Sequence, residues 1–227
     1  MPLRFRSAAL TVVVFAVAMA YLESAVVVYL QRALAITPDQ LFPLRGPDMV
    51  GDLAAIEVGR EFATVVMLAA VGCLVGWKWL DRLAWTAVAF GVWDICYYAW
   101  LWVFIGWPHS PATWDVLFLI PVPWAGPIWA PIAVSVALIG FGLAAAYRVR
   151  AGRIPRVAVW HAAAAVAGGL VVVVAFIANA PALLSGGVPG WFPWPVFVCG
   201  MALAGWPALS SLRASADVGQ ARSDRAV

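Results

Sequence analysis

The chain has 227 residues, of which 65% are hydrophobic and 11% are charged, and its mean hydropathy is +0.93. These values exclude a soluble globular domain with a polar surface and are typical of an integral membrane protein. The formal net charge is only +3, so the positions of the charges are more informative than their sum.

Six runs of about 20 apolar residues predict an all-α integral membrane protein, built as a bundle of six transmembrane helices. The predicted spans cover residues 8–30, 53–76, 83–105, 127–146, 157–178 and 194–212. Residues 1–213 then form a single transmembrane domain, and residues 214–227 form a short disordered tail. The first run resembles a secretory signal peptide in its basic flank, but it is too long and lacks a cleavage site, so we interpret it as a retained helix.

The basic residues gather on one side of the predicted membrane. They lie before the first span, in the two connections that follow the second and fourth spans, and after the sixth span: Arg4, Arg6, Lys78, Arg82, Arg148, Arg150, Arg153, Arg156, Arg213, Arg222 and Arg225. The positive-inside rule makes these segments cytoplasmic, so both termini are predicted to lie inside. We expect the protein to reside in a bacterial cytoplasmic membrane.

Acidic side chains interrupt the first three spans. Glu23 lies in the first span and Asp94 near the middle of the third, while Glu57 and Glu61 share one face of the second span, with Arg60 on an adjacent position. A carboxylate in hydrocarbon costs at least about 2.5 kcal/mol, so such residues normally face a protein interior or a water-filled cavity and have a functional role. These four acids are therefore the best indication of a functional site.

Ionisation of all four acids beside Arg60 would leave a net charge of −3 in a low-dielectric site. Such a charge requires compensation, and three forms remain open: bound metal cations, protonation of the carboxylates, or neutralisation by Arg32, Arg45 or His109.

The connection between the third and fourth spans contains the apolar segment TWDVLFLIPVPWAGP, residues 113–127. It is too short to span a membrane and is interrupted by Pro121, Pro123 and Pro127, so we predict a re-entrant or interfacial segment. His109 and Asp115 belong to this outer connection. The site is thus expected to be enclosed by the first three helices and this connection, and to open toward the extracytoplasmic side.

A carboxylate-rich group with at most one His is suited to a divalent cation such as Fe, Mn, Mg, Ca or Zn. The predicted metal ligands are Glu23, Glu57, Glu61, Asp94, His109 and Asp115. The spacing is a weak signal, because the chain contains no HExxH and no Cys/His framework. In the structural alternative, Glu57, Arg60 and Glu61 form an ion network that only packs helices, and Asp94 is a protonated acid hydrogen-bonded across a helix interface.

Other chemistries are excluded more firmly. Haem held by two His is not expected, because His109 and His161 lie on opposite sides, and retinal is not expected, because the only Lys, Lys78, lies in an inner loop. Nucleic-acid binding is not expected, because the basic residues are topological anchors. The small residues of AVAGG, residues 165–169, and those around Gly200 and Gly205 allow close approach of the fifth and sixth helices, which could scaffold the site or contact another subunit in a homo- or hetero-oligomer.

We therefore expect a membrane-embedded enzyme or metal-binding protein that acts on a lipidic or membrane-partitioned substrate, with membrane lipid as its surroundings. The predicted catalytic residues are Glu57, Glu61, Asp94 and Arg60. Two alternatives of different class remain open: a proton- or ion-coupled transporter that uses the same carboxylates, and an accessory subunit of a larger membrane complex. The chain has no internal repeat, which argues against a transporter.

Overall fold

The computed structural model describes residues 3–33, 35, 47–153, 157–185, 187 and 189–223, with 47–54 and 211–223 described by their backbone alone. This part of the chain is mostly helical. The elements are α1 (Phe5–Ala33), α2 (Pro47–Val75), α3 (Trp79–Ile105), β1 (Trp114–Phe118), β2 (Trp124–Pro127), α4 (Trp129–Arg150), α5 (Val159–Ile177), α6 (Ala180–Leu184) and α7 (Trp194–Ser223).

Five helical stretches among the described residues are long and apolar enough to cross a membrane. They are Phe5–Ala33, Ala55–Val75, Trp79–Ile105, Trp129–Arg150 and Val159–Leu184. The apolar part of α7, Trp194–Ser210, is shorter, so the sixth span stays a prediction. The coarser expectation of a helical, multi-pass chain agrees with these five helices.

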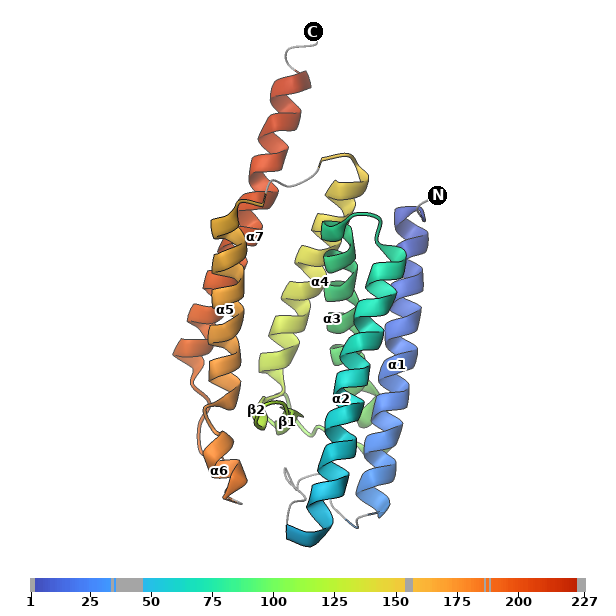
Figure 1. Cartoon of the computed structure of the whole chain (residues 1–227), viewed down its shortest axis with the longest axis vertical. Helices are drawn as coiled ribbons and strands as arrows, with labels where there is room; N and C mark the ends of the chain where they lie inside the picture. Colours follow the sequence, from blue (N-terminus) through green and yellow to red (C-terminus); the bar gives the residue numbers. More distant parts are fainter. Residues whose placement is uncertain are drawn as a thin grey trace.

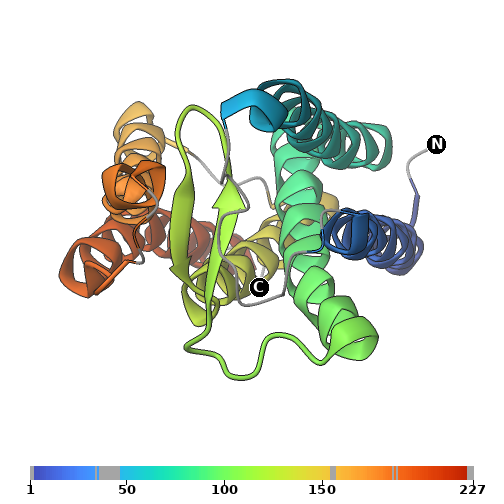
Figure 2. The same ribbon diagram turned by 90° about the horizontal axis from the view of Figure 1, so that it is seen from below.

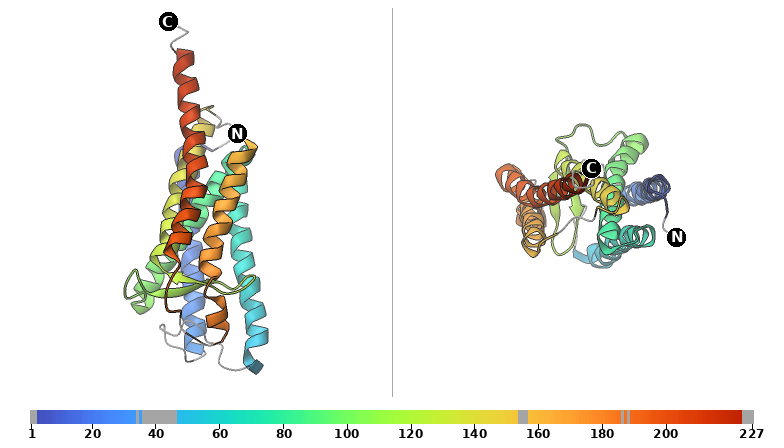
Figure 3. Two further views of the ribbon diagram at one scale, coloured as in Figure 1. Left: turned by 90° about the vertical axis from the view of Figure 1, so that its left-hand side faces the viewer. Right: turned by 90° about the horizontal axis from the view of Figure 1, so that it is seen from above.

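The long helices form two groups that lie side by side (Figure 1). In the first group, α3 packs against α1, α2 and α4, and in the second group α5 packs against α7. The groups meet where α7 contacts α4 and where β2 contacts α5. Helix α7 extends beyond the rest of the bundle at the end where α1 begins (Figure 3). We call this end the terminal end and the opposite end the hairpin end.

Small and apolar residues allow the first group to pack tightly. The residues Ala8, Ala16 and Ala20 of α1 are fully buried and belong to a core that also contains Trp85 of α3, which is 0% exposed. At the terminal end, Arg150 of α4 binds Asp81 of α3, with Nη2 at 3.2 Å from Oδ2. Since Arg150 also donates to backbone carbonyls of α2 and of the segment before α1, this one side chain joins all four helices.

The connection between α3 and α4 forms an antiparallel hairpin of two strands, where the sequence predicted an irregular re-entrant or interfacial segment. Trp114 pairs with Pro127 and Asp115 pairs with Gly126. Pro121 and Pro123 lie in the turn between the two strands. Proline has no backbone N–H, and residues in the turn do not need one to pair the strands. Seen from the hairpin end, the hairpin lies between the two helix groups (Figure 2).

Glycine positions the hairpin against the second helix group. A Cβ on Gly126 of β2 would lie within 3.0 Å of the rings of Phe176 and Phe192. The missing side chain therefore lets the aromatic core of α5 and the start of α7 pack directly on the strand.

Candidate functional site

A cavity of about 1010 Å³ lies between the two helix groups and reaches the hairpin. Side chains of α1, α2, α3, α4, α5, α7 and both strands line it. Its lining contains five acidic residues, which are Glu23, Glu57, Glu61, Asp94 and Asp115. The acids that the sequence singled out are therefore brought to one cavity, although they come from four different elements.

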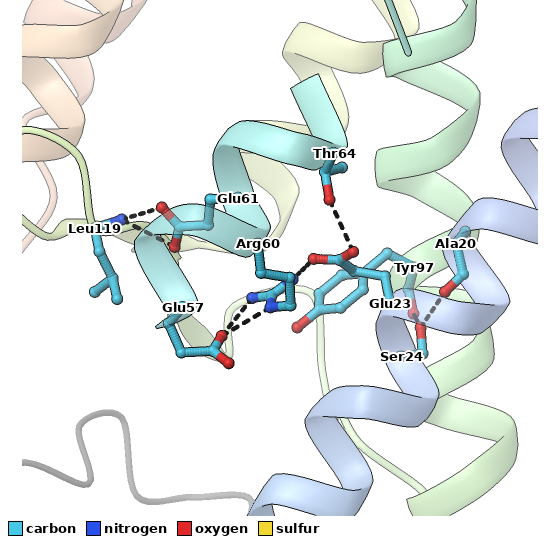
Figure 4. A network of polar contacts seen from close by, with 9 residues as sticks. All are labelled: Ala20, Glu23, Ser24, Glu57, Arg60, Glu61, Thr64, Tyr97 and Leu119. Atoms are coloured by element: carbon cyan, nitrogen blue, oxygen red, sulfur yellow. Dashed lines mark hydrogen bonds and ion pairs between the residues drawn. The ribbon is translucent and has the colours of Figure 1, made fainter. Parts of the chain in front are cut away.

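Arg60 of α2 lies between two of these acids (Figure 4). Its Nε donates to Oε2 of Glu57 at 2.8 Å, and its Nη2 lies 2.7 Å from the same oxygen. Its Nη1 forms an ion pair with Glu23 of α1. Thr64, one helical turn after Arg60, donates to the other oxygen of Glu23 at 3.0 Å. The guanidinium thus pairs with two carboxylates and joins α1 to α2.

Glu61 lies on the same helix but points away from Arg60, toward the turn of the hairpin (Figure 4). The backbone N–H of Leu119 donates to both of its oxygens, at 3.1 Å and 2.9 Å. The Glu61 side chain is buried. Its carboxylate therefore fixes the hairpin to α2 at the mouth of the cavity.

Asp94 of α3 is bound by the neighbouring helix α4. The hydroxyl of Ser135 in α4 donates to its Oδ2 at 2.7 Å. This short distance requires close packing of the two helices, which Gly91 provides: a Cβ on Gly91 would lie 2.6 Å from the backbone oxygen of Ser135. Asp94 thus forms the hydrogen bond across a helix interface that the structural alternative expected.

Asp115 connects the hairpin to α3. The Tyr98 hydroxyl donates to its Oδ2 at 3.1 Å and the backbone N–H of Val116 donates to its Oδ1 at 2.8 Å. Burial raises the pKa of Asp115 to about 7, although both hydrogen bonds lower it. Asp115 can therefore gain or lose a proton near neutral pH.

The predicted metal ligands do not form a cluster of the expected kind. Glu23, Glu57, Glu61, Asp94 and Asp115 line one cavity, but each carboxylate has its own protein partner. Among the residues that the structure describes, no group of three or more His, Cys, Asp or Glu side chains is arranged to hold a metal ion. The sixth predicted ligand, His109, lies between α3 and β1 and does not line the cavity. Metal binding stays a prediction that this arrangement does not support.

Arg32, one of the other basic residues proposed for charge compensation, does not reach the site. Arg32 is exposed near the end of α1 and does not line the cavity. Arg45 lies outside the described residues. Arg60 is thus the one basic side chain in the described lining.

Several residues of the site were not predicted from the sequence. Ser135 and Thr64 each donate to a carboxylate, and the second helix group contributes lining residues that are all apolar. Ser135 carried a signal, because it is an isolated polar residue in an otherwise apolar span. The partner of Glu61 carried none, because it is a backbone N–H on a segment 58 residues away.

Comparison with known protein families, curated proteins and solved structures found no match for this chain.

Proposed function

We propose that this chain is a membrane-embedded enzyme that acts on a lipidic substrate held in the cavity. One observation carries the proposal: five carboxylates and an arginine occupy part of the lining, while most of the remaining wall consists of apolar residues of the helices and the hairpin. A lipidic molecule has the same division, with a polar head and an apolar chain.

The apolar part of the cavity is deep enough to accept a hydrocarbon chain. It is lined along α4 from Pro131 to Phe141, which corresponds to about 15 Å at a rise of about 1.5 Å per residue. Helix α7 contributes lining residues from Met201 to Leu209. Small residues such as Gly169 and Gly205 keep this part of the wall open.

The proposal includes the predicted topology, with six spans, cytoplasmic termini and the hairpin on the extracytoplasmic side. It is supported by the arrangement of the described residues, because α1 begins and α7 ends at the same end of the bundle. Lys78 and Arg150 lie at that end, as the positive-inside rule requires of a cytoplasmic face. The polar part of the cavity then opens toward the outer half of the membrane.

The carboxylates divide into two roles in this proposal. Glu57 and Glu23 hold Arg60 and position the wall of α1 and α2. Glu61, Asp94 and Asp115 accept hydrogen bonds from uncharged donors, and these three are the candidates for general acid and base. Asp115 is the best suited to exchange a proton at neutral pH, because its pKa is about 7.

A proton-coupled transporter is the second candidate function. It is favoured by the raised pKa of Asp115, about 7, in a cavity that lies between two helix groups. Relative movement of such groups is a common way to alternate access to a central site.

The test begins with protein purified in a mild maltoside detergent. Lipids that co-purify are identified by mass spectrometry, and the protein is incubated with a lipid extract from the same cells to detect a converted species. We expect a specific enriched lipid and its conversion, both reduced in Asp94→Asn. Asp81→Asn is the matched control, because it makes the same change on the same helix, away from the cavity.

Other outcomes would contradict the proposal. Co-purified lipids that match the bulk membrane, together with no conversion, would refute it. Uptake by reconstituted vesicles that depends on a proton gradient would favour transport instead. Elemental analysis of the same preparation tests the predicted divalent metal.

A further inference from the structure

The charge of the cavity lining is strongly unbalanced. Five acidic side chains and one basic side chain, Arg60, belong to its described part. In addition, Arg60 is already paired with acids of the same lining, because two of its nitrogens contact Glu57 and the third forms an ion pair with Glu23. An anionic head group would therefore meet no free cation in this lining.

Three carboxylates have unused capacity to accept hydrogen bonds. Glu61 accepts one backbone N–H, Asp94 accepts one hydroxyl, and Asp115 accepts one hydroxyl and one backbone N–H. An ionised carboxylate offers about four lone-pair sites. All these donors are uncharged. Arg60 attracts Glu61 but the ion pairs of Arg60 in the described lining are with Glu23 and Glu57, so the three carboxylates, when ionised, have no ion-pair partner there.

Aromatic rings complete the polar part of the cavity. Trp93, Tyr97, Tyr98 and Trp107 all contribute to the lining. Aromatic faces attract ammonium groups, and this attraction strengthens when the site excludes water. Trp93 and Trp107 are 6% and 5% exposed, and their indole N–H groups have no hydrogen-bond partner among the described residues. Burial of both rings excludes water from this part of the wall, which strengthens their attraction for a cation.

We infer that the cavity selects a lipidic molecule with a positively charged head group, an amine or a quaternary ammonium, over one with an anionic phosphate or carboxylate head. Glu61, Asp94 and Asp115 supply the negative charge, and the tryptophan-rich wall supplies the aromatic faces. The inference rests on the proposed function, since it assumes that the cavity binds a lipidic molecule.

Two amphiphiles with the same alkyl chain test the inference. Dodecyltrimethylammonium and dodecyl phosphate are titrated at low mole fraction into maltoside micelles that contain the purified full chain, and tryptophan fluorescence reports binding. We expect saturable binding of the cation at least about tenfold tighter than binding of the phosphate, as expected for a charge contact in a partly buried site. Equal affinities, or tighter binding of the phosphate, would overturn the inference.

Matched variants separate the cavity from the rest of the surface. The double variant Glu61→Gln and Asp94→Asn should lose most of the preference for the cation, whereas Asp81→Asn, which removes a carboxylate outside the cavity, should retain it. The same preference in both variants would overturn the inference. If the double variant does not fold, the affinity of the wild type for dodecyltrimethylammonium is measured between about pH 8 and about pH 5. The charge of this probe is independent of pH, so its affinity must fall as the carboxylates take up protons.

The failure of the inference can be distinguished from the failure of the proposed function. If neither amphiphile binds saturably, the cavity does not hold lipidic molecules and both are wrong. If both bind in the cavity without regard to charge, only the head-group selectivity is wrong.

Discussion

Two adjacent glycines of α5 should respond in opposite ways to the same substitution. Gly168 faces α7, and a Cβ there would lie 2.3 Å from the backbone nitrogen of Ala204 and 2.7 Å from the backbone oxygen of Gly200. Gly169 faces the cavity, and a Cβ there would have nothing within 4 Å. We therefore compare Gly168→Ala with Gly169→Ala.

The expected magnitudes follow from these distances. Both changes remove a glycine from a helix interior, which stabilises by about 0.5 to 1 kcal/mol. At Gly168 the new methyl group would collide with backbone atoms, so α5 and α7 must separate, and overpacking of this kind costs about 1 to 3 kcal/mol. The free energy of unfolding should fall by about 1 to 2 kcal/mol in Gly168→Ala and rise by about 0.5 kcal/mol in Gly169→Ala.

Equilibrium unfolding in maltoside micelles, driven by added dodecyl sulfate and followed by circular dichroism, measures both changes. The comparison is internal, because the residues are neighbours and the substitutions are identical. If Gly168→Ala is at least as stable as Gly169→Ala, then α5 and α7 do not pack through Gly168 and Gly200, and the wall of the cavity formed by these helices is placed wrongly.

Three further predictions concern the charged groups. Replacing Arg60 by Met leaves the buried Glu23 and the half-buried Glu57 without their cation. The free energy of unfolding should therefore fall by about 3 kcal/mol and be partly restored by adding Glu23→Gln. The same detergent titration measures this, and no restoration would contradict the ion pair. The pKa of Asp115 is about 7 in the folded state and about 4 in the unfolded state. The stability that this group contributes is therefore present below about pH 4 and is lost as the pH rises to about 7. The free energy of unfolding falls over this range by up to about 1.4 kcal/mol per pH unit. Thermal unfolding at a series of pH values should show this slope in the wild type and not in Asp115→Asn; an equal slope in both would assign the titration to other groups. Asp81 is 0% exposed and binds Arg150, so Asp81→Asn should lower the free energy of unfolding by about 3 kcal/mol. The protein that remains folded should retain its co-purified lipid. Loss of the lipid as well would mean that the two ends of the bundle are coupled.

The long helices could be predicted from the sequence, because an apolar run of about 20 residues has few stable alternatives. The predicted spans at 8–30 and 83–105 lie within α1 and α3. The acids in these spans could also be predicted to share a site, because a carboxylate in hydrocarbon is too unfavourable to face lipid. Glu23 and Asp94 of these two spans line the cavity, and so do Glu57 and Glu61 of the second predicted span.

The hairpin and the partners of the acids could not be predicted in the same way. Residues 113–127 were expected to be irregular because of their prolines, yet the strands before and after the turn satisfy their backbone groups by pairing with each other. This pairing depends on the surrounding helices, as when Phe176 of α5 packs on Gly126. Likewise the choice of Ser135 as the donor to Asp94 depends on how α4 packs on α3, which residue spacing along one helix does not encode.

Four of the five carboxylates of the cavity, all except Glu57, also join two parts of its wall, so charge and structure must be separated by the choice of substitution. Asp94 joins α3 to α4 through Ser135. An Asn at this position keeps a carbonyl oxygen that can accept the Ser135 hydroxyl, whereas an Ala removes both the charge and the acceptor. If Asp94 acts by its charge or its proton, conversion of the lipid should be lost in Asp94→Asn as fully as in Asp94→Ala, with Asp94→Asn the more stable of the two. If Asp94 only holds the helices together, Asp94→Asn should retain conversion and Asp94→Ala should lose it together with stability. The Asn variant therefore distinguishes an acid that takes part in chemistry from one that maintains the shape of the cavity.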